Sequence, residues 1–174
     1  MRARPLATAD NTVVVPNYSG SIPLVVAQGY TQTSNGEASD ADVTGSSITL
    51  PDGWFTEGKT LKYTLAGTVT GSNGTISVKL YFEDGAVMTL TSADGAAGDW
   101  QAEFTIVATG AATQRIVGRL LAQAGAEVVT DYATDTTNTA AAGTIPVKAQ
   151  ITLANAADVI TSEYVRIEAW SKAD

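Results

Sequence analysis

The chain contains 174 residues with a formal net charge of −8, and it has neither cysteine nor histidine. Disulfides and thiolate metal sites are therefore excluded, as is catalysis that needs a histidine base or a cysteine nucleophile. The acidic charge disfavours contact with nucleic-acid phosphates, and no apolar run is long enough to span a membrane. We predict a protein without enzymatic activity or cofactor that binds no nucleic acid and does not insert into a membrane.

Residues 1–16 are predicted to form an extended arm, and residues 17–174 a single domain. The arm is basic at its start and contains a β-branched run before Pro16. Such a short run cannot bury enough apolar surface to order itself, but it can add a strand to the open edge of another protein. The residues of the arm that we expect to contact a larger scaffold are Arg2, Arg4, Val13, Val14 and Val15.

Short β-strands separated by polar turns follow the arm. Residues 22–27 contain a proline, which marks an edge strand, and residues 31–45 form a polar loop. Apolar and polar residues alternate in both 61–69 and 76–82, and the turn between these segments contains Asn73-Gly74. Because Asn-Gly is a strong signal for a tight turn, we predict that the two segments pair as a hairpin.

Residues 100–109 show the most regular strand pattern, with Trp100 expected in the core. Residues 114–124 fit either a strand or a helix. We prefer the strand because Gly118 in the middle of a helix would cost about 1 kcal/mol relative to alanine. Residues 131–143 are rich in Thr, Ala and Asn and are predicted to be a loop.

A series of short strands without a long amphipathic helix defines the fold class. Alternation resumes in residues 145–153 and closes the chain at 165–170. This pattern predicts an all-β protein, an antiparallel β-sandwich with jelly-roll or Greek-key order, of which we favour the jelly roll, and with an extended N-terminal arm.

Apolar residues on both faces of two strands suggest a second buried surface. Val107 lies on the polar side of its strand, and Val117 and Leu121 lie opposite the expected core side of theirs. A two-layer sandwich buries only one face of each sheet, so we predict that these three residues contact a partner, most simply another copy of the chain. Arg115 and Arg119 are expected to be surface or interface residues.

Clustered carboxylates raise two further hypotheses. Asp40 and Asp42 form a D-x-D pair, and Asp131 and Asp135 lie in a second predicted loop. Such oxygens could hold calcium, although a solvated loop fits them better because EF-hand spacing is absent. Glu83-Asp84 could take part in glycoside hydrolysis, which needs two carboxyls across a cleft, but acids before a glycine are typical of turns. We predict no metal site.

Aromatic side chains could stack on sugar rings if they were exposed on a sheet. We favour core or subunit contacts for most of them, because aromatics supply much of the buried area in cores and interfaces. The candidates are Trp54, Phe55, Tyr63, Tyr81, Trp100, Tyr132, Tyr164 and Trp170.

Three segments resemble the jelly-roll domains of tailed-phage structural proteins. Gly98–Ile106 matches a G-x-W-x-x-x-x-x-I strand, and residues 58–67 match the preceding G-x-x-L-x-x-x-x-x-G strand. Val165–Trp170 matches a closing V-x-I-E-x-W strand, which in that pattern follows a hydrophobic strand such as 145–153. The similarity covers the chain from about Trp54 onward.

The resemblance implies a non-enzymatic component of the virion surface that is soluble before assembly. It predicts a capsid decoration or cement protein, trimeric, whose arm binds the major capsid protein or another virion scaffold. The alternative is a carbohydrate- or receptor-binding module of a phage tail or head fibre, with host-surface glycans as partners. No active-site residues carry over from the resemblance.

Overall fold

The computed structural model describes most of the chain beyond the predicted arm. The described residues are 24–29, 33–35, 40–51, 53–71, 75–82, 85–93, 97–122, 127–136, 145–153 and 158–171. The predicted arm and its five contact residues lie outside these ranges. Within them the chain forms strands and turns, and no helix is long and apolar enough to cross a membrane.

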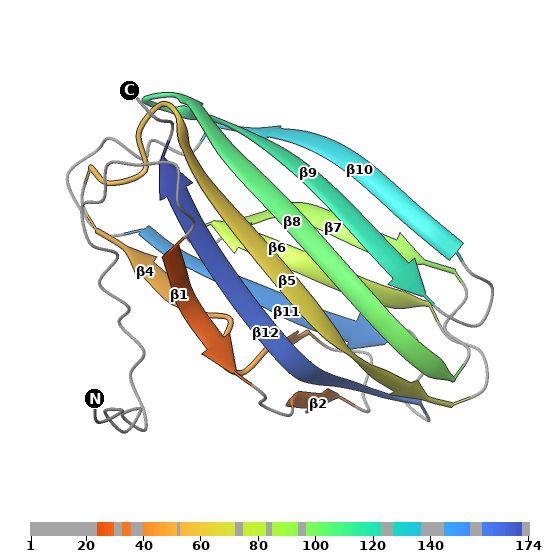
Figure 1. The fold of residues 1–174 in the computed structure, drawn as a ribbon. Helices are drawn as coiled ribbons and strands as arrows, with labels where there is room; N and C mark the ends of the chain where they lie inside the picture. Colours follow the sequence, from red (N-terminus) through yellow and green to blue (C-terminus); the bar gives the residue numbers. More distant parts are fainter. Residues whose placement is uncertain are drawn as a thin grey trace, which may run out of the picture.

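Two antiparallel sheets pack face to face (Figure 1). The larger sheet has the order β1-β12-β5-β8-β9-β10, with β2 also paired to β12. The smaller sheet has the order β3-β11-β6-β7, with β4 also paired to β11. The strands of the larger sheet are β1 (Leu24–Gly29), β2 (Thr33–Asn35), β5 (Lys59–Thr70), β8 (Gly98–Gly110), β9 (Thr113–Ala122), β10 (Glu127–Asp135) and β12 (Val159–Ser171). Those of the smaller sheet are β3 (Ala41–Asp42), β4 (Ile48–Leu50), β6 (Ile76–Phe82), β7 (Gly85–Ser92) and β11 (Ile145–Leu153).

The core lies between the sheets because nearly every long strand alternates buried and more exposed residues. Buried side chains follow period two along β5, β6, β8 and β9, so one face of each strand points inward. Leu65, Phe104 and Ile106 are completely buried between the sheets. The predicted antiparallel β-sandwich is therefore confirmed.

The predicted hairpin between 61–69 and 76–82 is wrong. β5 pairs with β8 and β12, whereas β6 pairs with β7 and β11 in the other sheet. The chain crosses from one sheet to the other between the two strands, as it does between β7 and β8. Alternation specifies that each strand buries one face, and this is equally true of strands that pair and strands that face each other across a core.

The ambiguous region after Gly110 forms strands. β9 covers residues 113–122, which confirms the preference for a strand over a helix. A side-chain carbon on Gly118 would lie 2.3 Å from Met88 Sδ, so the glycine admits the β7 side chains that pack on β9. β10 extends through Asp135, so part of the predicted 131–143 loop is the edge strand of the larger sheet.

Trp100 joins three neighbouring strands of the larger sheet. Its indole is 2% exposed, and its Nε1 donates a hydrogen bond of 3.2 Å to the Thr161 carbonyl in β12. Gly67 of β5 lies directly opposite Trp100, next to a bulge in β12. A side-chain carbon at Gly67 would lie only 1.8 Å from the Thr161 oxygen. The absence of a side chain on β5 therefore lets the β12 carbonyl come close, and Trp100 supplies a donor for it.

The outer edge of β11 is closed by the segment that contains β3 and β4. β3 pairs with Gln150 and Ile151, and β4 pairs with Val147 and its neighbours. Between them the buried Ser46 hydroxyl donates to the Ala149 carbonyl at 3.2 Å and accepts from the Ala149 amide at 3.0 Å. The side chain thus replaces a backbone partner where this edge segment is irregular, which leaves less of the edge open to other chains.

We predict that Gly67→Ala destabilises the fold more than any other single methyl addition in the larger sheet. The added carbon would collide with backbone rather than with a flexible side chain.

Trp100→Phe should lower the free energy of unfolding by about 1–3 kcal/mol, because it removes the donor to the Thr161 carbonyl. Urea denaturation measures both. Gly110→Ala is the control, since its added carbon meets nothing closer than 4.0 Å; equal midpoints for Gly67→Ala and Gly110→Ala would contradict the prediction.

Candidate functional site

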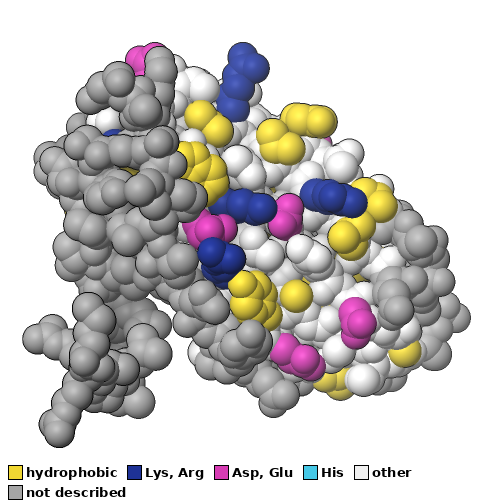
Figure 2. Space-filling model, viewed as in Figure 1, with side chains coloured by type: hydrophobic (Ala, Val, Ile, Leu, Met, Phe, Trp, Pro, Cys, Tyr) yellow, Lys and Arg dark blue, Asp and Glu magenta, His cyan; other side chains and the backbone are white. Residues whose placement is uncertain are grey.

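The outward side chains of the larger sheet form rows across its strands. One row contains Leu121 of β9, Gln101 of β8 and Ala66 of β5, and the next contains Arg119, Glu103 and Thr64. Cross-strand neighbours on one face lie close enough to contact each other. Residues that are far apart in sequence are thereby brought together on this outer face, which is shown from the front in Figure 2.

A shallow hollow opens between two of these rows. It is lined by Gln101 and Glu103 of β8 and by Arg119 and Leu121 of β9, with a volume of about 100 Å³. We call this feature the β8–β9 hollow. Its lining combines an amide, a carboxylate, a guanidinium and an apolar side chain, so it offers donors, acceptors and an apolar wall within one small depression.

The charges around the hollow are only partly paired with one another. Lys62 Nζ of β5 lies 3.1 Å from Glu103 Oε1. Arg119 stands directly opposite Glu103 in the ladder, yet it forms no ion pair with any described residue. The carboxylate is held toward β5, whereas the guanidinium in the hollow keeps its donors unpaired with any carboxylate of the described residues.

Exposed apolar side chains border the hollow on the β10 side. Val128 lies opposite Leu121 and is 50% exposed. Tyr132, which is 75% exposed, lies opposite Val117, which is 43% exposed. The structure also places Val107 on this outer face, so all three residues predicted as an interface point outward on one sheet. Their role in a trimer stays a prediction.

The aromatic candidates fall into three groups. Trp54, Phe55, Tyr63 and Trp100 are buried in the core. Tyr81, Tyr164 and Trp170 are partly buried. Tyr132 is the most exposed large apolar side chain among the described residues. The preference for core or subunit contacts is thus confirmed for the four buried members and stays a prediction for the other four, and Tyr132 is the member best placed to meet a ligand.

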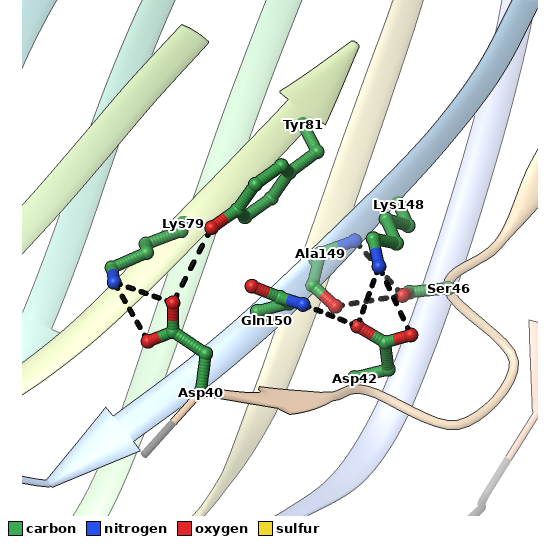
Figure 3. Close-up of polar contacts among 8 residues, drawn as sticks. All are labelled: Asp40, Asp42, Ser46, Lys79, Tyr81, Lys148, Ala149 and Gln150. Atoms are coloured by element: carbon green, nitrogen blue, oxygen red, sulfur yellow. Dashed lines mark hydrogen bonds and ion pairs between the residues drawn. The ribbon is translucent and has the colours of Figure 1, made fainter. Parts of the chain in front are cut away.

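The outer face of the smaller sheet has a different character, because its charges are paired internally (Figure 3). Asp40 accepts hydrogen bonds from Lys79 Nζ at 2.6 and 2.7 Å and from the Tyr81 hydroxyl at 3.3 Å, and it also accepts from Thr152. The hydrogen bond from Lys79, followed by that from Thr152, lowers the pKa of Asp40 below its ordinary value.

Asp42, two residues further along the same segment, is held in the same way by residues of β11. It accepts hydrogen bonds from Lys148 Nζ at 2.9 and 3.1 Å and from Gln150 Nε2 at 2.5 Å. Partial burial opposes ionisation, but the hydrogen bonds from Gln150 and Lys148 outweigh it and lower the pKa of Asp42. We call Asp40, Asp42 and their partners the carboxylate clamp, because they fasten the 40–42 segment to β6 and β11.

The contacts of the carboxylate clamp argue against calcium binding by Asp40 and Asp42. Each carboxylate is neutralised by its own lysine, so a cation would have to displace an ammonium group from each. Asp131 and Asp135 lie in β10 rather than in a loop, and the Asp131 carboxylate accepts the Tyr132 amide at 2.8 Å. Among the described residues no three potential ligands cluster as a metal site. The Glu83-Asp84 pair lies outside the described residues.

Comparisons with known proteins find likeness only at the level of structure. No protein-family model and no curated protein matches the chain. A CBM2 module of the evolved Dit of Lactobacillus casei BL23 phage J-1 is similar at 12% identity and a TM-score of 0.41, covering 74% of this chain and 69% of that one. Arcelin-5, a lectin-like defence protein of Phaseolus vulgaris, is similar at 6% identity and a TM-score of 0.48, covering 87% and 100%. The basic winged bean lectin, solved with Tn-antigen, has 7% identity, a TM-score of 0.38 and coverage of 78% of each chain.

These likenesses concern the β-sandwich, and the site is defined by this chain's own side chains. Sequence reasoning named Arg119, Leu121 and Tyr132 but assigned them to an interface or to the core. It missed Gln101 and Glu103, whose even spacing on the outer side of the Trp100 strand was the signal available.

We predict that the clamp contributes to stability only while its aspartates are ionised. Their pKa values are lowered in the folded state, so this contribution is complete above the ordinary value of 3.8 and is lost as the pH falls through the lower folded values. The stability difference between the wild type and Asp40→Asn/Asp42→Asn should stay constant from pH 7 to about 5 and shrink only in stronger acid. Urea denaturation at a series of pH values measures it. Glu57→Gln, at an exposed carboxylate outside the clamp, is the control, and a difference that disappears already near pH 5 would contradict the assignment.

Proposed function

We propose that the chain is a non-enzymatic carbohydrate-binding module of a phage virion, and that the outer face of its larger sheet carries the binding site. The observation that carries the proposal is the β8–β9 hollow together with the exposed Tyr132, which lies opposite Val117 on the adjacent strand β10. The virion setting rests on the resemblance of the strand motifs to tailed-phage structural proteins. The capsid-decoration role and the docking of the arm stay predictions.

The composition of the hollow suits a sugar ring. A pyranose presents hydroxyls that both donate and accept at its edge, and apolar C–H groups on its faces. Gln101 offers a donor and an acceptor, Glu103 offers acceptors, and Arg119 offers donors. Leu121 and the exposed Tyr132 offer apolar surface for a ring face. Ligand sites commonly combine such apolar contact with a few placed polar groups.

The same face fits a dry interface between copies less well. Along β9 the outward residues alternate between charged and apolar, in the order Arg115, Val117, Arg119 and Leu121. Burying these arginines in a trimer interface would strip them of water, and the buried centres of interfaces are depleted in charge. A glycan leaves much of the face wet, so the guanidinium groups keep their hydration where they are not in contact.

The smaller sheet offers a weaker site. Its outer face is polar, and its carboxylates and lysines already bond to one another in the clamp. Lys148 Nζ also lies 5.5 Å from the centre of the Tyr81 ring, which occupies part of the aromatic surface. A ligand there would have to compete with contacts that the protein makes itself.

We expect the purified protein to bind members of a glycan array, and Tyr132→Ala to weaken the best hit about tenfold in titration calorimetry. Loss of an aromatic stacking partner worth about 1.4 kcal/mol gives that factor. Tyr81→Ala, on the opposite face, is the matched control and should leave the affinity unchanged. Far-UV circular dichroism and urea midpoints establish that both variants are folded.

Two results would overturn the proposal. One is the absence of binding to any glycan on an array that includes bacterial surface polysaccharides. The other is binding that Tyr81→Ala abolishes while Tyr132→Ala leaves it intact, because that outcome would move the site to the smaller sheet.

A further inference from the structure

The outer face of the larger sheet is locally positive although the chain is acidic. We consider the four adjacent strands β12, β5, β8 and β9 and the four consecutive rows that cross β5 at Ala66, Thr64, Lys62 and Thr60. The outward side chains of these rows include four cations and two acids. The cations are Lys62, Arg115, Arg119 and Arg166, and the acids are Glu103 and Glu168. Two further acids lie on the same face in the adjoining row, where Asp99 stands opposite Thr68 and the Thr68 hydroxyl donates to Glu163 at 3.0 Å. Figure 2 shows these charges interleaved across the front of the molecule.

Pairing consumes both acids of these rows. Lys62 Nζ binds Glu103 at 3.1 Å, and Arg166 Nη2 binds Glu168 at 2.9 Å. Four cations less two paired cations leave Arg115 and Arg119, neither of which has an ion-pair partner among the described residues. A local charge of +2 therefore lies on the same face as the hollow, in a chain whose formal charge is −8.

Position distinguishes the two unpaired arginines. Arg119 lines the hollow together with Gln101 and Leu121, whereas Arg115 lies two rows away, opposite Val107. A guanidinium binds a planar oxyanion with two parallel hydrogen bonds, a geometry that a lysine cannot supply. Glu103 would repel such an anion if it were free, but Lys62 neutralises it at the far side of the hollow.

We propose that the β8–β9 hollow selects acidic glycans and holds the sugar's carboxylate or sulfate on Arg119. This inference rests on the proposed carbohydrate-binding function and specifies its ligand class. The acidic group pairs with the guanidinium, Gln101 bonds to a hydroxyl, and the ring rests against Leu121 and the surface that extends to Tyr132. At physiological ionic strength the screening length is about 8 Å, so charges on other faces act only weakly on the hollow. Among the charged groups that line it, Glu103 is paired with Lys62, and Arg119 has no ion-pair partner among the described residues.

The test compares matched pairs of oligosaccharides that share a backbone and differ by one acidic group. A uronate-containing oligosaccharide is paired with its carboxyl-reduced form, and a sulfated oligosaccharide with its unsulfated form. The wild type should bind the acidic member of at least one pair tenfold or more tightly, with an affinity that falls as salt is raised. The pair that shows the preference identifies the oxyanion as carboxylate or sulfate.

Three variants assign the preference to a residue. Arg119→Gln should remove the preference and bind both members with the weaker affinity of the neutral one. Arg119→Lys should retain only a small part of it, because the charge remains and the fork geometry is lost. Arg115→Gln is the matched control, with the same charge change on the same strand face, and should preserve the preference within about threefold.

The outcomes separate failure of the ligand class from failure of the function. Equal binding of both members of every pair, with Tyr132→Ala still weakening both, would overturn the acidic class and leave the glycan site in place. Absence of binding to all of them would overturn both proposals. A preference that persists in Arg119→Gln and disappears in Arg115→Gln would overturn the assignment to the hollow.

Discussion

The register of the three central strands depends on one contact in the interior of the larger sheet. Trp100 donates to the carbonyl of Thr161, and Gly67 provides the space in which that carbonyl approaches β5. β8, β5 and β12 are aligned at this point, immediately beside the β12 bulge. Any slip by one residue would turn the inner face of a strand outward. A contact made on the inner face therefore fixes the outer rows of β8, β5 and β12, and the pairing of β9 with β8 then completes the hollow.

The same period of two serves the core and the candidate site. In β8 every second residue from Trp100 to Ala108 is buried in the interior. Gln101, Glu103 and Thr105 lie between them and project outward. Sheet twist and cross-strand register then place Glu103 beside Arg119 without any loop to position it. A site on strands is held by the rigidity of the sheet. The ion pair between Glu103 and Lys62 orders the acidic side of the hollow, and the Arg119 guanidinium is left for a ligand.

The two outer faces show how similar residues can have different uses. On the smaller sheet Asp40 and Asp42 are each bonded to a lysine, and the buried Ser46 hydroxyl completes the backbone bonding of Ala149. These contacts close the β11 edge and fasten the segment that covers it. On the larger sheet Arg115 and Arg119 have no ion-pair partner among the described residues, so part of the polar capacity is left for another molecule.

Local sequence was informative about single strands and uninformative about their neighbours. The alternation around Trp100, and the glycine at 118, correctly predicted β8 and β9 as strands. The hairpin prediction failed because the alternation in β5 and β6 does not say whether two strands pair or face each other. β10 was missed because its Thr, Ala and Asp residues resemble a loop until Val129 and Ala133 are seen against the core. The hollow could not be predicted because its lining comes from two strands whose register only the folded sheet defines.

Nuclear magnetic resonance titration of the ¹⁵N-labelled protein with the best-binding glycan tests the central claim most directly, because it reports on every amide at once. If the glycan binds at the β8–β9 hollow, the largest amide chemical-shift changes should fall on Gln101, Glu103, Arg119, Leu121 and Tyr132. The amide shifts of the carboxylate clamp should not change. Chemical-shift changes centred instead on Lys79, Tyr81 and Gln150 would place the ligand on the smaller sheet and contradict binding at the β8–β9 hollow.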